Sequence, residues 1–347
     1  MPLAVGDPPL PEHGELSVAL IELDHVSKEF VVHTKAGRVR RTRRAVPAVT
    51  DVSLTVEAGE VVGYIGPNGA GKSTTIKMLT GILVPSAGTI RVAGLDPQRR
   101  RRELAARIGV VFGQRTQLWW DLPLRDSFAL LRHIYQVPAA RHAENLGRFV
   151  ELLDLGAFLD TPVRQLSLGQ RMRGELTAAL LHDPSVVYLD EPTIGLDVVS
   201  RQRVREFLAE VNREEGVTVL LTTHDLDDVE QLSTRLVVID DGRVIHDGTV
   251  DEVKARYVEH RTLVVDLEAP GPSVRVQGAE VVKVEGTRQW LRFHPADLSA
   301  PELIARVVAL VAVRDLTIEE PDIEDVVTRI YTRERATDDV ARPGEVA

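Results

Sequence analysis

The 347-residue sequence contains no cysteine, few aromatic residues and no long apolar run. Without cysteine there is no disulfide framework and no thiol chemistry, which fits a reducing compartment. Aromatic residues make up 4% of the chain and hydrophobic residues 44%, so aliphatic side chains must build the core. No apolar run approaches the roughly 20 residues of a membrane-spanning helix. Residues 1–7 also lack the basic and apolar segments of a secretory signal.

A surplus of basic residues is missing as well, because the formal net charge is −10. Proteins that bind nucleic acids usually carry a basic surplus, so we expect no nucleic-acid partner. The exception is residues 35–44 (KAGRVRRTRR), where basic side chains are dense. The simpler interpretation of this run is a solvated insertion loop. The alternative is a contact with anionic lipid headgroups or a membrane partner.

The most informative motif is residues 66–74 (GPNGAGKST), which fits the phosphate-binding pattern G-x-x-x-x-G-K-[ST]. A strand-like run precedes it and a helix-like run follows it, as the pattern requires. Glycine lets backbone N–H groups approach a phosphate chain, Lys72 can reach the β- and γ-phosphates, and Ser73 can hold Mg²⁺. The predicted nucleotide contacts in this loop are Gly66, Pro67, Asn68, Gly69, Ala70, Gly71, Lys72, Ser73 and Thr74.

Residues 185–191 (SVVYLDE) read as an apolar strand that ends in two acids. An Asp at the carboxyl end of a parallel strand beside a phosphate loop can hold Mg²⁺, which favours Asp190 as a metal ligand. Because side chains alternate along a strand, Glu191 is expected to point elsewhere and to polarise a water for attack on the γ-phosphate. Acids at strand ends often have no such role, and only the pairing with the phosphate loop favours this interpretation.

Residues 166–170 (LSLGQ) lead into a run with helical spacing, and Ser167 is a suitable N-cap. A helix N-terminus can bind an anion, so this is a second candidate phosphate site. Since residues 66–74 already hold one phosphate chain, two such sites suggest that two chains face each other. An ordinary capped helix is the alternative. Gln114 and His224 each follow a strand-like run, on the loop side of the predicted sheet.

In this order the motifs resemble those of the ATP-binding subunits of ATP-binding cassette (ABC) transporters. Residues 66–74 resemble the Walker A loop of that family, 166–170 its signature sequence and 186–191 its Walker B strand, while 194–197 (IGLD) resemble its D-loop. The resemblance implies that ATP and Mg²⁺ are the cofactors. The catalytic residues that it implies are Glu191, His224, Gln114 and Lys72, and the metal ligands are Ser73, Gln114 and Asp190. The further nucleotide contacts that it implies are Phe30, which would stack on adenine, Ser167, Gly169, Gln170 and Asp197.

The resemblance also implies an ATP-dependent homodimer that powers transport through separate membrane permease chains, as a peripheral protein at the cytoplasmic face of the membrane. One departure is Leu168, where the family usually has glycine. The form LSLGQR and residues 117–123 (QLWWDLP) resemble a subgroup of two-component export systems, so export is expected. The alternatives are an importer ATPase, a soluble ABC ATPase acting on ribosomes or DNA, and a P-loop kinase or GTPase.

Alternating strands and helices over residues 18–257 predict an α/β domain of the P-loop NTPase type, the ABC ATPase fold. It would have an antiparallel edge layer that carries Phe30 and a helical subdomain at about 115–180. Residues 258–332 predict a small α+β accessory domain. Its final helix would pack an apolar stripe on the domain's own sheet, with a partner interface as the alternative, and the stripe consists of Ile323, Val326, Val327, Ile330 and Tyr331. Residues 1–17 are expected to be flexible, and 333–347 to form a polar tail.

Overall fold

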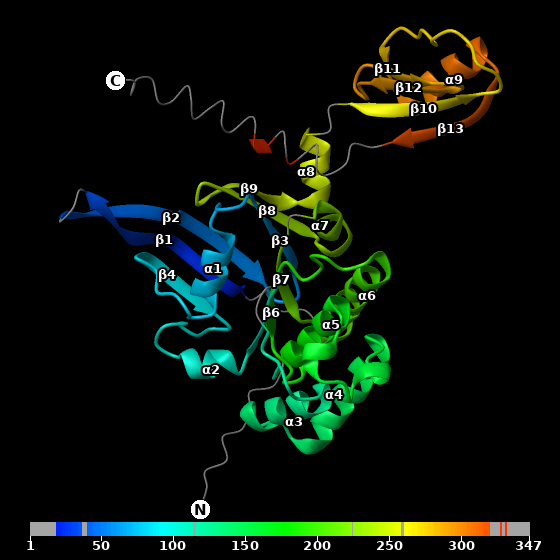
Figure 1. The fold of residues 1–347 in the computed structure, drawn as a ribbon. Helices are drawn as coiled ribbons and strands as arrows, with labels where there is room; N and C mark the ends of the chain where they lie inside the picture. The colour runs from blue at the N-terminus through cyan, green and yellow to red at the C-terminus, as the bar shows by residue number, and fades with distance from the viewer. Residues whose placement is uncertain are drawn as a thin grey trace, which may run out of the picture. The chain divides into compact units, whose positions relative to one another are not determined.

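The computed structural model describes residues 19–36, 40–113, 116–223, 225–257 and 260–319, together with Val327, Ile330 and Tyr331 (Figure 1). The predicted flexible N-terminus, the polar tail, Gln114 and His224 lie outside the described residues. The chain divides into two units. The first contains the described residues up to 62, together with 68–222 and 241–243, and the second contains 63–67, 223–240 and the described residues from 244 onward.

The edge layer of the first unit is an antiparallel sheet in the order β2-β1-β4, formed by β1 (Ala19–Ala36), β2 (Arg40–Glu57) and β4 (Ala87–Val92). It carries Phe30 on β1, as the sequence predicts. The expectation of a loop is wrong for residues 35, 36 and 40–44, because β1 and β2 stay paired up to Ala36 and Arg40, while residues 37–39 lie outside the described residues. β-Branched residues such as Val31 and Val32 favour the extended conformation of β1, with which the basic residues 40–44 of β2 pair.

The main sheet has the order β5-β6-β7-β3-β8-β9. Its strands are β3 (Val61–Ile65), β5 (Ile108–Phe112), β6 (Val186–Asp190), β7 (Thr218–Thr222), β8 (Arg235–Asp240) and β9 (Arg243–Thr249). β5, β6 and β7 are parallel, and β7 is buried along its whole length, as expected where both faces of a sheet are covered. The register pairs Phe112 with Asp190 and Asp190 with Thr222, so the carboxyl ends of the three strands lie together.

The helices of the first unit include those of the predicted helical subdomain. They are α1 (Lys72–Leu79), α2 (Arg101–Ala105), α3 (Leu124–Ile134), α4 (Ala139–Leu152), α5 (Leu168–Leu180) and α6 (Val198–Glu215), with the short 3₁₀ helices η1 (Gly156–Phe158) and η2 (Val163–Gln165). Pro138 precedes α4, a position where its missing N–H costs nothing. The buried side chains of Phe128 on α3 and Phe149 on α4 belong to the core of this region.

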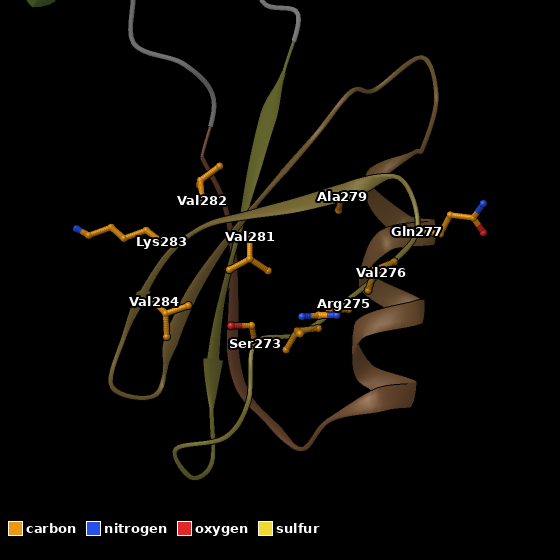
Figure 2. A pocket seen from close by; sticks show the side chains of 10 residues that line it. Ser273, Arg275, Val276, Gln277, Ala279, Val281, Val282, Lys283 and Val284 are labelled. Atoms are coloured by element: carbon orange, nitrogen blue, oxygen red, sulfur yellow. The ribbon is translucent and has the colours of Figure 1, made fainter.

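The second unit contains α7 (Leu226–Leu232), α8 (Val250–Tyr257) and an antiparallel sheet in the order β11-β12-β10-β13, with α9 (Ala300–Leu310) packed on it. The strands of this sheet are β10 (Arg261–Leu267), β11 (Ala279–Glu285), β12 (Arg288–Phe293) and β13 (Val313–Glu319). Beside β11 lies an open cavity of about 670 Å³. Val281 points into it, toward the segment that carries Ser273 and Arg275 (Figure 2).

The apolar stripe near residue 330 does not pack where the sequence suggests. Val327 and Ile330 join a buried cluster with Val229 of α7, Val238 of β8 and Val253 of α8, and Tyr331 lies against the same cluster. The prediction that the stripe covers the C-terminal sheet is therefore wrong for these residues. Helical spacing identifies an apolar face, but it does not determine which of two sheets that face will cover.

The close packing of α5 on β5 makes Gly109 a sensitive position. A Cβ there would stand 2.3 Å from the backbone oxygen of Ala179, so we expect Gly109→Ala to lower the free energy of unfolding by about 1–3 kcal/mol. The control is Gly147→Ala on α4, where a Cβ would meet no atom within 4 Å and should stabilise the helix by about 0.5–1 kcal/mol. Urea denaturation measures both, and an unchanged Gly109→Ala protein would contradict the close packing.

Candidate functional site

The loop between β3 and α1 has the backbone that a phosphate-binding loop needs. Gly69 and Gly71 have φ angles of 89° and 108°, in the left-handed region that L side chains rarely adopt. A Cβ on Gly69 would meet no heavy atom within 4 Å, so the loop is open at this point. Gly71 is also the N-cap of α1, whose first turn presents backbone N–H groups to an anion.

Lys72 begins α1, and its side chain is buried. Burial lowers the pKa of its ammonium group, while the nearby carboxylates of Glu191 and Asp190 act in the opposite direction. A desolvated ammonium interacts with an anion more strongly than one in bulk water does. Lys72 is therefore well placed to neutralise phosphate charge.

Asp190 lies at the carboxyl end of β6, where two hydroxyl groups hold its carboxylate. Ser73 Oγ donates to Asp190 Oδ2 at 3.1 Å, and Thr222 Oγ1 donates to Asp190 Oδ1 at 2.6 Å. The structure thus brings the predicted metal ligands Ser73 and Asp190 together. Hydroxyl and carboxylate oxygens suit Mg²⁺, which usually takes one or two carboxylates and completes its shell with water and phosphate. The residues present therefore fit this ion.

Thr222 was missed by the sequence analysis. Threonine is common in strands, so its type gives no functional signal. Its position at the end of a strand adjacent to β6 is the feature that could have identified it. It orients Asp190 in the way that outer partners orient metal ligands.

The backbone of Glu191 differs from the expectation. The residue lies beyond the end of β6 and has a φ angle of 57°, so strand alternation does not set its direction and that argument is wrong. Its N–H donates to the backbone oxygen of Thr222 at 2.9 Å, which fixes the left-handed turn. Such a conformation is unfavourable for a residue with a side chain and is concentrated at functional sites. The carboxylate of Glu191 lies near enough to Lys72 to oppose the lowering of that residue's pKa, as the carboxylate of Asp190 does.

The predicted N-cap at Ser167 is confirmed. Ser167 Oγ accepts from the N–H of Gln170 at 3.2 Å, and Gln170 Oε1 accepts from the N–H of Ser167 at 2.9 Å, which is a capping box. The cap uses the serine hydroxyl only as an acceptor, and its proton can still be donated to a phosphate. The side chain of Gln170, a predicted nucleotide contact, serves the cap in this structure.

Gly169 and Asp197, also predicted nucleotide contacts, lie where α5 and α6 run side by side (Figure 1). A Cβ on Gly169 would stand 2.8 Å from Ser200 Oγ. Asp197 caps α6, because its carboxylate accepts from the N–H of Ser200 at 2.9 Å and from the hydroxyl of Ser200 at 2.7 Å. These hydrogen bonds lower the pKa of Asp197. Contacts within one chain therefore explain why position 169 is glycine and why position 197 is aspartate.

Phe30 lies on β1 opposite Val46 of β2, with its ring partly exposed. Lys28 Nζ is 5.4 Å from the centre of the ring. An exposed aromatic ring of this kind can stack on a base. Gln114 and His224 lie outside the described residues, so their roles stay predictions.

The sequence pattern of the family described as ABC transporter matches residues 49–194. The Nod factor export ATP-binding protein I of Paraburkholderia xenovorans is 35% identical over 322 residues, which cover 91% of this chain and 98% of that protein. This chain belongs to the ABC transporter family. It is an ATP-binding subunit that hydrolyses ATP to energise transport, as an ABC ATPase.

Two further comparisons bear on this ABC ATPase. The methionine import ATP-binding protein MetN 2 of Enterococcus faecalis is 33% identical over 303 residues, 84% of each chain. A solved dimeric ATP-binding cassette in a post-hydrolysis state, bound to ADP and Pi, has 25% identity and a TM-score of 0.57 over 66% of this chain and 98% of that chain. In the part of the chain that the structure describes, no helix is long and apolar enough to cross a membrane.

The hydrogen bond from Thr222 to Asp190 predicts a change in metal dependence. Thr222→Val keeps the buried shape but removes the donor, so the Mg²⁺ concentration for half-maximal ATP hydrolysis should rise about 10–100-fold. Thr222→Ser keeps the hydroxyl and is the matched control. Titration of hydrolysis against Mg²⁺ tests this prediction, and an unchanged midpoint in Thr222→Val would show that Thr222 does not orient Asp190.

Proposed function

We propose that this ABC ATPase drives export, acting as an ATP-dependent homodimer at the cytoplasmic face of the membrane with separate membrane-spanning chains. Export is supported by the extent of similarity to the Nod factor export protein, which covers more of this chain than the similarity to the methionine import protein does. The LSLGQR form of the signature also favours export. The solved dimeric cassette supports the homodimer.

The observation that carries the ATPase site is the hydrogen-bonded group of Ser73, Asp190 and Thr222 beside the buried ammonium of Lys72. We assign Ser73 and Asp190, with Gln114, to Mg²⁺, which when bound neutralises phosphate charge and orients the γ-phosphate. Lys72 then contacts the β- and γ-phosphates through the mouth of the phosphate loop. Phe30 stacks on the adenine ring.

Glu191 is assigned as the general base that takes a proton from the attacking water. Its backbone is left-handed, unlike that of the strand residue Asp190, and we infer from this that one acid serves the metal and the other serves the water. His224 is assigned to hydrogen-bond the γ-phosphate. The two acids can therefore act at the same phosphate without competing for one role.

In the homodimer, Ser167 and Gly169 of one protomer face the nucleotide held by the phosphate loop of its partner. The helix dipole of α5 and the unused hydroxyl proton of Ser167 both favour an anion there. Bound γ-phosphate thus supplies a contact between protomers that hydrolysis removes, which makes dimerisation a ligand-driven switch.

Replacing the proposed general base separates binding from turnover. Glu191→Gln should still bind ATP, but its rate of hydrolysis should fall by at least ~10²-fold, because a positioned acid–base group contributes about that much. The control is Glu151→Gln, an exposed position on α4 that should hydrolyse ATP like the parent. Phosphate release and equilibrium ATP binding are measured, and near-normal release would remove Glu191 from this role.

The slowed protein also tests the transporter assignment. Tagged Glu191→Gln protein captured from native membranes with ATP and Mg²⁺ should bring polytopic membrane chains with it, and these are identified by mass spectrometry. Permeases of import systems would contradict export. Ribosomal or DNA-bound proteins, with no membrane chain, would contradict the whole transport proposal.

The shared-site arrangement predicts a specific defect in Ser167→Arg. The arginine should leave ATP binding to the single chain intact but block the ATP-dependent dimer, because its bulk fills the space for the partner's phosphate. Loss of the cap costs only about 1 kcal/mol, so the fold should remain. Ala143→Arg on α4 is an exposed control with the same change in charge. Size-exclusion chromatography with ATP in a Glu191→Gln background measures the dimer, and its survival in Ser167→Arg would contradict the shared site.

A further inference from the structure

The C-terminal sheet carries a cavity that the ATPase site does not use. It is the opening of about 670 Å³ beside β11, and pockets for small organic molecules typically measure roughly 300–1,000 Å³. One wall is β11 and the other is the segment of residues 273–277 (Figure 2). All of these residues belong to the second unit, so the cavity forms within one unit.

The segment that precedes β11 is a fixed wall. Gln289 of β12 is fully buried, and its Oε1 accepts from the N–H of Val274 at 2.8 Å while its Nε2 donates to the backbone oxygen of Pro272 at 3.1 Å. Near the other end of the segment, Ala279 N donates to Val276 O at 3.1 Å. The fold therefore holds the cavity open, which lowers the cost of ordering the site when a ligand binds.

The apolar part of the lining is continuous with the core of the sheet. Val274 and Val276 belong to that core, and Val281 packs against it from β11. At the rim of the cavity, Val282 and Val284 have 40% and 44% of their surfaces exposed. Apolar side chains in both places favour a ligand with an apolar body, because such a ligand would cover them from water.

The charged part of the lining is positive. Arg275 and Lys283 line the cavity, and none of the described lining residues is an acid, although the net charge of the chain is −10. Lys283 already has partners, since its Nζ lies 2.9 Å from Glu285 Oε1 and 4.6 Å from the centre of the Trp290 ring. Its side chain extends away from the segment that carries Arg275 (Figure 2).

Arg275 differs from Lys283 in having no such partner. Within the part of the chain that the structure describes, its side chain makes no hydrogen bond or ion pair. The same holds for the hydroxyl of Ser273, two residues earlier in the same wall. A guanidinium presents several donors in a planar fork that matches a carboxylate, so Arg275 is available to hold an anion at the cavity.

The outer edge of β11 also lines the cavity, because β11 is the last strand in the order of the described sheet. An unpaired edge can accept an added strand from a peptide or from a second copy of the chain. Here the register shifts between Val281 and Lys283, which indicates a bulge, and the edge carries a lysine. Both features discourage strand pairing, so the cavity suits a small molecule better than a strand.

We propose that this cavity binds a small organic anion in which a carboxylate is attached to an apolar body. The carboxylate contacts the guanidinium of Arg275, and the body lies against Val276 and Val281. This site goes beyond the proposed function, because it is a second ligand site on the chain that shares no residue with the nucleotide motifs.

The test uses octanoate as the probe and the full chain without nucleotide. Octanamide has the same apolar body without the charge, and acetate has the charge with almost no apolar body. Isothermal titration calorimetry should show saturable binding of octanoate to one site on each chain. Octanamide should bind at least about tenfold more weakly, because it cannot form charge-assisted hydrogen bonds with Arg275. Acetate should show no saturable binding.

Three variants at exposed positions separate the two parts of the site. Arg275→Gln should lower the affinity for octanoate to that for octanamide, while the affinity for octanamide stays within about twofold of the parent value. The matched control is Arg292→Gln, which removes the same charge from β12 outside the cavity and should bind octanoate like the parent. Val282→Ser removes an apolar group from the rim and should weaken both probes by a similar factor of about two to five.

Equal affinities for octanoate and octanamide would overturn the inference, and so would the absence of saturable octanoate binding. An Arg275→Gln protein that loses no more affinity than Arg292→Gln would also overturn it.

Two further measurements address a strand at this edge. A terminally blocked peptide of alternating valine and threonine that displaces octanoate and binds more tightly would show that β11 accepts a strand, which would refute the small-anion site. Dimers that form without ATP and dissociate in octanoate would refute it in favour of a second copy. Because nucleotide is left out, none of these results bears on the ATPase proposal, which Glu191→Gln tests independently.

Discussion

The register of three parallel strands is the constraint on which the site depends. Backbone pairing places Phe112, Asp190 and Thr222 side by side at the carboxyl ends of β5, β6 and β7. A shift of one residue would turn the side chain of Asp190 to the opposite face and separate it from the hydroxyl of Ser73. The buried apolar faces of β6 and β7 hold this register, so the aliphatic core determines the geometry of a polar site.

Several residues with a locally unfavourable burial or backbone conformation lie in and around the site at the carboxyl ends of these strands. Lys72 and Glu175 are buried charged side chains, and Glu191 has a left-handed backbone without being glycine. Each of these features costs free energy of folding. Residues that are locally unfavourable in this way are expected mainly at functional sites. The three residues lie on α1, directly after β6 and on α5, which are elements of the proposed site. The described part of the C-terminal sheet has an ordinary aliphatic core.

Sequence patterns predicted the fold class and the meeting of Ser73 with Asp190, because these follow from motif order and from the topology of parallel strands. Sequence patterns gave wrong predictions where the local structure depends on contact with a residue far away in the sequence. The strand conformation of residues 40–44 depends on pairing with β1, and the packing of Val327 and Ile330 depends on which sheet is nearest. The turn at Glu191 depends on the carbonyl of Thr222, which is far away in sequence. Thr222 itself carried no signal, since threonine is ordinary in a strand.

The departure from the usual signature, Leu168, has its explanation within the chain. A Cβ on Gly195 would stand 2.9 Å from Leu168 Cδ2, so the leucine side chain lies against Gly195 of its own protomer. The close approach of Gly169 to Ser200 belongs to the same packing of α5 on the start of α6. The bulk that replaces glycine is thus directed along the chain's own surface, while the hydroxyl of Ser167 keeps its capping geometry. Leu168 therefore contacts Gly195 of the predicted D-loop, and the N-terminal end of α5 keeps its capping box.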